Sequence, residues 1–560
     1  MMKKRYPEKQ NVLLVNITRL GDMLQATPTI AGIKKENPSG KITVLVERQF
    51  EAICHSLPFI DEVVSIDLSF VVRALKQDGE GVIDSYQYLT DFVEDLRNRS
   101  FDYCLNMSSS AYTALLISLI GIKRSGGWTA DTSGHRRIQS EWAKLFATSV
   151  FHQNRVYNSL NLVDIFRCSA DVSEHPHHLL MTVKKEDAEY AETLLRSGVF
   201  TDNGPIIAIQ SGASQLKRQW SPKYFGELIK ILRRELRARI VLTGSPKERA
   251  LAEQIKILSE EDNVAVFAGN TSVTQLGGLL EKCDLLITGD TGPMHMATAV
   301  NTPVVAMFLA SAYGFETGPY RENSIVLQPI IGCGPCNPNK PCALPECHDT
   351  ISPELVARLA ILRLAGPILT LESRDIGVGA KAVNIYRTVF DQNGFFDMEA
   401  LSPSYQDSNA RYRGAYRALW LEELGGLYPS GHSYTDFCVA KKKILNERIE
   451  NNIDEGIAQL KLLARQGKDS IETLISLIND VLSPPRRLGE MSERLAKIDH
   501  EIELVGYHYG ALEPVTRMFI FGKENLELEE PLALADEMGN IYAALERRVI
   551  RFAEFLNNEH

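Results

Sequence analysis

The chain has 560 residues, a formal net charge of −10 and 44% hydrophobic residues. This length suits about two to four domains, and the composition is that of a soluble globular protein. The acidic balance argues against a general nucleic-acid-binding protein, although a local basic patch is compatible with it. No apolar run is long enough for a signal peptide or a membrane span. We therefore expect a cytoplasmic protein.

Short apolar runs alternate with helical patterns in the first 200 residues. This alternation predicts a parallel sheet that is covered on both faces. Residues 125–178 are less regular and end in His175-Pro176-His177-His178. We interpret this histidine cluster as a solvated interdomain loop rather than a metal site, because no carboxylate or cysteine pattern accompanies it. The expected strands are 11–16, 42–46, 62–66 and 101–106, and the expected helices include 24–36 and 84–99.

The segment 201–205, Thr-Asp-Asn-Gly-Pro, reads as a linker, and the alternation then starts again. Two such series joined by a linker predict two doubly wound domains that face each other across a cleft. The expected strands of the second series are 206–209, 239–243, 264–267, 283–288 and 302–308, and its expected helices begin at 221, 246 and 273.

The pattern changes from about residue 370. Segments 384–390 and 395–399 flank Asp391-Gln392-Asn393-Gly394, which predicts a β-hairpin. Long helical patterns follow and predict a helical bundle. This region contains no recognisable catalytic motif, so we expect it to serve in assembly or in docking a partner. The helical patterns are 410–424, 435–465, 469–482, 488–504 and 532–558.

Four loops carry polar or small residues where strands end. In 289–295 a Gly-bearing turn leads into a helix, where backbone N–H groups and the helix dipole suit a phosphate. An ordinary turn with Asp290 or Thr291 as helix cap is the alternative. Loop 210–221 combines small residues with two cations, which suits a diphosphate. In the loop 18–22, Asp22 is either a helix cap or a general base. The fourth loop is 243–248.

Taken together and in this order, the loop motifs resemble glycosyltransferase family 9, the ADP-heptose:lipopolysaccharide heptosyltransferases. The resemblance covers about residues 11–365. It implies an α/β GT-B fold, in which two Rossmann-like domains enclose the active cleft, and inversion without a catalytic metal. The absence of an Asp-x-Asp sequence agrees with this implication. The motifs are Arg19-Leu20-Gly21-Asp22, Lys217-Arg218-Gln219-Trp220, Gly244-Ser245-Pro246-Lys247-Glu248 and Asp290-Thr291-Gly292-Pro293-Met294-His295.

The resemblance also implies domain ranges. We expect an N-terminal Rossmann-like acceptor domain at 1–200 and a nucleotide-sugar domain at 201–369. The hairpin and helical extension then occupy 370–560. A long helical extension is unusual for the lipopolysaccharide enzymes, and it leaves open an oligomer or a partner bound through this region.

Site residues are implied by the same resemblance. Asp22 would be the general base that deprotonates the acceptor hydroxyl, and Lys217 would stabilise the charge that develops on the diphosphate. The family usually has Lys-Arg-Trp-Pro, whereas Gln219 intervenes here, so either Lys217 or Arg218 can make the main phosphate contact. The predicted donor-binding residues are Ser211, Gly212, Arg218, Glu248 at the ribose, Asp290 at the sugar hydroxyls, Thr291 and Gly292 at the phosphates, and His295.

A cysteine-rich segment occupies residues 333–348. Its C-x₂-C pair aims two thiolates at one ion, and four thiolates suit a structural zinc or iron. Similar clusters occur in family members, including a protein-modifying branch that looks iron-bearing. Free thiols and disulfides are the alternatives, and disulfides are disfavoured in the cytoplasm. The predicted ligands are Cys333, Cys336, Cys342 and Cys347, with His348 as a substitute for one of them.

The leading hypothesis is an inverting transferase that uses ADP-heptose and acts on a lipopolysaccharide core or on another glycan or protein hydroxyl. Such an enzyme would work in the cytoplasm or peripherally at the inner face of the inner membrane. One alternative is a family member with another nucleotide-hexose donor. A second is a non-catalytic scaffold that binds sugar nucleotides. Asp22 and Lys217 argue against the scaffold, since a decayed enzyme need not keep both.

Overall fold

The computed structural model describes residues 10–17, 19–76, 80–149, 151–197, 200–342, 345–376, 382–401, 407–427, 452–480, 484–527 and 530–557. Backbone contacts divide the chain into two units. The first comprises residues 1–136 and 160–406, and the second comprises 137–159 and 407–560. Thr18, Cys438 and most of the predicted helix 435–465 lie outside the described residues.

A six-stranded sheet forms the first half of unit 1, in the order β3-β2-β1-β4-β5-β6. The central pairs are parallel, as the sequence predicts. Leu13 and Leu45 of the sheet pack with Leu96 and Leu116, so α5 and α6 bury one sheet face. The strands are β1 (Asn11–Val15), β2 (Lys41–Glu47), β3 (Glu62–Ile66), β4 (Tyr103–Asn106), β5 (Ser125–Ala130) and β6 (Arg136–Ile138). The helices are α1 (Leu20–Gln25), α2 (Thr27–Glu36), η1 (Arg48–Phe50), α3 (Glu51–Cys54), α4 (Leu68–Ala74), α5 (Glu80–Asn98), α6 (Ala111–Ile120), α8 (Leu162–Ser169) and α9 (Lys185–Arg196).

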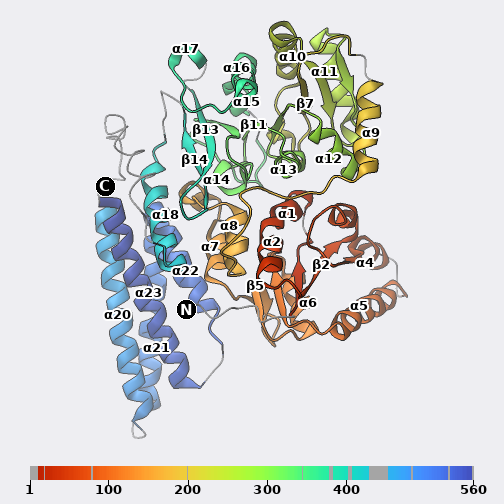
Figure 1. Cartoon of the computed structure of the whole chain (residues 1–560). Helices are drawn as coiled ribbons and strands as arrows, with labels where there is room; N and C mark the ends of the chain where they lie inside the picture. The colour runs from red at the N-terminus through yellow and green to blue at the C-terminus, as the bar shows by residue number, and fades with distance from the viewer. Residues whose placement is uncertain are drawn as a thin grey trace. The chain divides into compact units, whose positions relative to one another are not determined.

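An eight-stranded sheet forms the second half, in the order β14-β13-β12-β11-β10-β7-β8-β9 (Figure 1). Ile209 and Ile287 of this sheet pack with Leu228 and Leu359, so α10 and α16 cover one face. The strands up to this point are β7 (Ile206–Gln210), β8 (Arg239–Thr243), β9 (Val264–Val266), β10 (Leu285–Gly289), β11 (Val304–Met307) and β12 (Ile325–Pro329). The helices are η3 (Leu216–Arg218), α10 (Pro222–Leu236), η4 (Pro246–Glu248), α11 (Arg249–Ser259), α12 (Val273–Glu281), α13 (Gly292–Ala299), α14 (Gly314–Thr317), α15 (Glu346–Thr350), α16 (Pro353–Ala365) and α17 (Ser373–Ile376).

The predicted hairpin forms, but it belongs to the second sheet. Strands β13 (Val383–Phe390) and β14 (Phe396–Ala400) pair antiparallel, and β13 also pairs antiparallel with β12. This pairing satisfies backbone groups that an open edge of β12 would expose. The buried rings of Tyr386 and Phe396 add to the core. The expected range 370–560 therefore differs from the contact units, which keep the hairpin with the α/β part and place residues 137–159 with the helices.

Unit 2 is helical, as the sequence predicts for the C-terminal region. The expected break between residues 465 and 469 does not occur, and α20 runs through Gly467. The Tyr542 ring packs on this glycine, where a Cβ would lie 2.2 Å from Cε1. No helix among the residues described above is long and apolar enough to cross a membrane. The helices are α7 (Glu141–Ser149), η2 (His152–Tyr157), α18 (Ala410–Gly425), α20 (Ile453–Asn479), α21 (Pro485–His508), η6 (Gly510–Leu512), α22 (Glu513–Glu524) and α23 (Pro531–Asn557).

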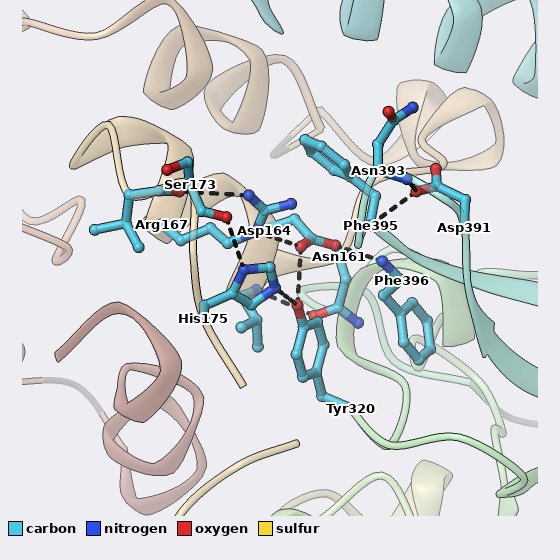
Figure 2. A network of polar contacts seen from close by, with 12 residues as sticks. Asn161, Asp164, Arg167, Ser173, His175, Tyr320, Asp391, Asn393, Phe395 and Phe396 are labelled. Carbon is cyan, nitrogen blue, oxygen red and sulfur yellow. Dashed lines mark hydrogen bonds and ion pairs between the residues drawn. The ribbon is translucent and has the colours of Figure 1, made fainter. Parts of the chain in front are cut away.

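A buried polar network joins the two halves of unit 1 (Figure 2). One carboxylate oxygen of Asp164 on α8 accepts hydrogen bonds from Arg167 Nε at 2.8 Å and from the Tyr320 hydroxyl at 2.9 Å. The other oxygen accepts the Phe396 N–H of β14 at 2.9 Å. His175 Nε2 lies 3.0 Å from the Tyr320 hydroxyl. The histidine segment that we predicted as an interdomain loop thus contributes to this network.

We expect Asp164→Ala to lower the free energy of unfolding by about 3–5 kcal/mol, because it leaves the buried Arg167 guanidinium without its counter-ion. Asp164 is fully buried and Arg167 is 3% exposed. Urea denaturation of both proteins measures the change. The matched control is Asp95→Ala, which removes a largely exposed ion pair with Arg99 and should cost less than about 1 kcal/mol. Equal losses in the two variants would contradict a structural role for the network.

Candidate functional site

A small pocket lies in the second domain, where β7, β10 and β11 end. Strand β7 lies between β10 and β8, so the strand order reverses at this point of the sheet. Open α/β sheets bind ligands outside the carboxyl ends of their strands at such a reversal. The lining residues are Gln210, Ser211, Gly212, Arg218, Trp220, Phe225, Gly289, Met307 and Leu309. Of the predicted donor-binding residues, Ser211, Gly212 and Arg218 therefore share one pocket.

Glu248 is fixed against the first loop of this pocket. Its carboxylate accepts the Ser245 N–H at 2.7 Å and lies 3.4 Å from the Gln210 side-chain amide. A Cβ on Gly212 would lie 1.6 Å from Glu248 Oε1, so a larger residue at this position would displace the Glu248 carboxylate. The side chain of Glu248 therefore holds the loops 210–212 and 244–248 together.

Arg218 faces the loop that begins α13. Its Nη2 donates to the Asp290 carbonyl oxygen at 2.7 Å, and its guanidinium forms an ion pair with the Asp290 carboxylate. The two side chains are 13% and 15% exposed, respectively. Arg218 Nε is buried and has no hydrogen-bond partner among the described residues. Since a guanidinium has five N–H donors in a fixed fork, this group retains donors for an anionic ligand.

Lys217 points elsewhere. Its ammonium donates to the backbone carbonyl oxygens of Asn337, Pro338 and Lys340, at 3.0, 2.9 and 2.7 Å. These carbonyls belong to the cysteine-rich segment and do not line the pocket. The sequence leaves open which of the two cations contacts a phosphate, and the structure brings only Arg218 into the pocket.

The start of α13 is the turn that we predicted to bind an anion. Thr291 occupies the N-cap position, yet its side chain makes no capping hydrogen bond. Its hydroxyl lies 3.0 Å from the Thr288 hydroxyl instead. The Thr291 side chain therefore caps no N–H group of the first turn. The Met294 N–H donates to the Thr291 carbonyl oxygen at 3.1 Å, and the helix dipole favours a negative ligand at this end.

Helix α1, which carries Asp22, packs on α13. Gly21 allows this approach, because a Cβ there would lie 2.9 Å from His295 Cδ2. Leu20 packs on Gly292 in the same way, with 3.0 Å to a Cβ built on that glycine. The Asp22 carbonyl accepts a hydrogen bond from the Asn16 side chain at 2.9 Å. The predicted base thus lies on a helix that directly contacts the predicted donor-binding helix.

His295 is 4% exposed, and burial lowers its pKa to about 4. The imidazole is therefore neutral at pH 7. Its Nδ1 has no hydrogen-bond partner among the described residues. The His295 ring packs against Gly21 of α1. This packing role explains a buried neutral imidazole here, so we assign no proton transfer to it.

The pKa of His295 predicts a pH dependence of stability. Between pH 6.5 and 4 the unfolded chain binds a proton at this residue and the folded chain does not, so stability falls as pH falls. The loss between pH 7 and pH 5 is about 2 kcal/mol. We expect His295→Gln to have a correspondingly shallower dependence in urea denaturation at the two pH values. His55→Gln, at an exposed position, is the control and should keep the wild-type dependence, and an unchanged slope in His295→Gln would refute the assignment.

The four clustered cysteines lie in the second domain. Cys333 and Cys342 are exposed, Cys336 is half-buried, and Cys347 is buried in the core. Burial raises the pKa of Cys336 to about 11, and the neighbouring thiol of Cys333 adds to this shift. Within the described ranges, no three His, Cys, Asp or Glu side chains are grouped so that they could hold a metal ion.

Sequence reasoning missed part of the pocket wall and the carbonyl oxygens that bind Lys217. Met307 and Leu309 lie at and just after the end of β11, and apolar residues at a strand end give no functional signal. Backbone carbonyls are present in every residue, so no residue type could have indicated those of 337–340. The sequence did indicate the two cations at 217 and 218, but it did not indicate in which direction each side chain points.

Comparisons with known proteins identify the family that this chain resembles. Residues 89–348 match the family model of glycosyltransferase family 9 (heptosyltransferase). Lipopolysaccharide heptosyltransferase 3 of Escherichia coli is 26% identical over 313 residues, which cover 54% of this chain and 85% of that protein. Lipopolysaccharide core heptosyltransferase OpsX of Haemophilus influenzae is 23% identical over 320 residues, 56% of this chain and 82% of that protein.

The fold has a counterpart among solved structures. A glycosyltransferase family 9 structure from Veillonella parvula superimposes with a TM-score of 0.50 at 20% identity, covering 64% of this chain and 98% of that chain. The expected α/β GT-B architecture with a helical extension is thereby confirmed. The segment 89–348 thus belongs to glycosyltransferase family 9, and this similarity supports a glycosyltransferase activity.

Proposed function

We propose that the enzyme transfers a heptose from ADP-heptose, with inversion, to a hydroxyl group of a lipopolysaccharide core or of another glycan or protein. One observation carries this proposal: Arg218 lines a pocket where the strand order of the second sheet reverses, and it forms an ion pair with Asp290, two residues before α13 begins. A cation beside the start of a helix suits a diphosphate. The names of the relatives support the heptose, since they are heptosyltransferases.

In the proposed reaction the acceptor oxygen attacks the anomeric carbon while the bond from this carbon to the ADP oxygen breaks. Asp22 takes the proton of the acceptor hydroxyl. The leaving ADP gains negative charge, which Arg218 and the N–H groups at the start of α13 stabilise. Asp290, fixed by its ion pair with Arg218, would bind sugar hydroxyls, and Glu248 would face the ribose. We propose that these cationic and N–H groups suffice for catalysis without a metal ion.

Calorimetry against a panel of nucleotide-sugars tests the donor. We expect ADP-heptose to bind more tightly than ADP-, UDP- and GDP-hexoses. Tighter binding of a hexose nucleotide would favour the alternative donor within the family. Binding without turnover on any lipopolysaccharide or protein acceptor would favour the scaffold, and no binding at all would overturn the proposed site.

A structural zinc or iron at Cys333, Cys336, Cys342 and Cys347 stays a proposal. Two observations support it: the C-x₂-C spacing and the closeness of the thiols, which influence one another's ionisation. The described arrangement does not group three ligands, so binding requires the thiol side chains to turn toward one ion. Metal analysis of the wild-type protein and of Cys336→Ser tests this, and equal metal contents would contradict it.

Helices α18, α20, α21, α22 and α23 have no proposed part in the chemistry. We propose that they assemble the enzyme into an oligomer or dock a protein partner. Light scattering of the full-length chain distinguishes a monomer from an oligomer. A monomer would refute assembly into an oligomer, and the proposal would then be limited to docking a protein partner.

A further inference from the structure

Lys217 and Arg218 are adjacent in sequence but contact different parts of the second domain. Both lie on the 3₁₀ turn η3, where three residues complete one turn, so consecutive side chains point about 120° apart. Arg218 reaches Asp290 at the start of α13, and Lys217 reaches the carbonyls of 337–340. The backbone of η3 therefore cannot aim both cations at one diphosphate in this conformation.

The ammonium of Lys217 is fully used. It has three N–H donors, and three carbonyl oxygens lie at 2.7 to 3.0 Å from Nζ. No donor remains for a phosphate. The carbonyls belong to Asn337, Pro338 and Lys340, which connect Cys336 to Cys342. Residues 331–342 form no helix or strand, so these hydrogen bonds substitute for a regular ladder in holding the segment.

Two further contacts fasten the same pair of segments. His348 Nε2 donates to the Lys217 carbonyl oxygen at 2.8 Å. The indole N–H of Trp220 lies 3.2 Å from the carbonyl oxygens of both His348 and Ile351. Trp220 is 2% exposed and also lines the pocket. The chain is thus bound on both sides of Arg218, at Lys217 and at Trp220, to the cysteine-rich segment and the residues just after it.

We propose that Lys217 is a positioning residue, which fastens the cysteine-rich segment to the donor loop and thereby fixes Arg218 in the pocket. This inference rests on the proposed function for the identity of the ligand. Its consequence is regulatory: a change in the cysteine-rich segment, such as metal binding or thiol modification, is transmitted to the donor pocket through Lys217. The prediction from sequence, a direct contact between Lys217 and the diphosphate, is the alternative.

Binding of ADP to Lys217→Met, to Arg218→Met and to the combined variant separates the two roles. A direct phosphate contact of Lys217 would weaken ADP further in the combined variant than in Arg218→Met. A positioning residue acts through Arg218, so we expect Lys217→Met to weaken ADP about fivefold and the combined variant to bind ADP as Arg218→Met does. Additional loss in the combined variant would overturn the proposal, and so would unchanged affinity in Lys217→Met. Lys223→Met, which removes an exposed cation from α10, is the matched control and should bind ADP as the wild type does.

A second measurement does not depend on the ligand. We expect faster modification of Cys333 and Cys342 by a thiol reagent, and faster amide exchange over 331–342, in Lys217→Met than in the wild type. Lys217→Arg keeps the charge, but its planar guanidinium does not match three carbonyl oxygens. We therefore expect Lys217→Arg to restore only part of the protection of the cysteines and amides. If Lys217 instead bound a phosphate, arginine would replace it fully. Wild-type protection in Lys217→Met would refute the fastening. If the wild-type enzyme bound no nucleotide, the proposed nucleotide-sugar donor would be refuted. The rates of thiol modification and amide exchange would still test whether Lys217 fastens the cysteine-rich segment.

Double substitution tests the transmission. If Cys336→Ser weakens ADP through Lys217, the combined variant Lys217→Met/Cys336→Ser should weaken ADP by less than the product of the two single factors. A loss of ADP affinity equal to the product of the two single factors would show that the two residues act independently, and it would contradict the coupling.

Discussion

Asp22→Asn is expected to lower the rate of glycosyl transfer by about 10²–10⁴-fold, because an amide cannot accept the proton of the acceptor hydroxyl. The change is nearly isosteric, and the α1 backbone that packs on α13 is unaffected. Calorimetry should therefore give wild-type affinity for ADP, while the transfer rate at saturating donor collapses. A separate donor titration and a single-turnover assay measure the two quantities.

The matched control is Asp91→Asn, which removes a carboxylate from the exposed face of α5 in the same domain. It should retain full activity. Retention of the wild-type rate in Asp22→Asn would remove Asp22 from the chemistry and leave it as a residue in the first turn of α1. A parallel loss of ADP affinity would instead indicate that α1 has moved away from α13.

Arg218→Met is expected to lower the transfer rate by about 10²–10³-fold, the effect of removing one preorganised donor from a developing negative charge. It should also reduce the preference for ADP over adenosine, because the lost contact is with the diphosphate. Calorimetry with both ligands and steady-state assays measure these effects. Lys217→Met should reduce ADP binding and the transfer rate by less than Arg218→Met does, because it displaces the guanidinium of Arg218 without removing it.

Two controls separate charge from geometry. Arg249→Met removes an arginine of α11 that contacts Asn270 outside the pocket, and it should leave binding unchanged. Arg218→Lys keeps the charge but loses the fork that reaches the Asp290 carbonyl oxygen and carboxylate together. We expect it to restore only part of the rate. Full restoration by lysine would show that charge alone, and not the ion pair with Asp290, matters at this position.

The fold and the outline of the site were accessible from the sequence for a local reason. Strand runs such as Val12–Val15 and Leu285–Ile287 are apolar on both faces, because a parallel sheet covered by helices buries both. Loops that follow such strands lie at one edge of the sheet by topology alone. Ser211, Arg218 and Gly289 could therefore be expected near one another before any coordinate was known, and they do line one pocket.

Other features depend on contacts that no local pattern encodes. The hairpin at 383–400 was predicted from its turn, yet its pairing with β12 depends on which sheet edge is open. The close approach of Gly21 to His295 needs two helices from different domains. The Asp164 network likewise combines residues more than 150 positions apart. Sequence spacing carries no information on such pairs.

Residue type indicates what the proposed site could bind, and tertiary structure determines which side chain reaches it. By itself the sequence specified two cations, a glycine-bearing turn and a carboxylate at strand ends, which is the chemistry of a diphosphate-sugar site. Lys217 and Arg218 were equivalent at that level. Only the fold separated them, since the turn η3 directs one cation to Asp290 and the other to the carbonyls of 337–340. The physical reason is that charge belongs to the residue, whereas direction belongs to the backbone and to what packs around it.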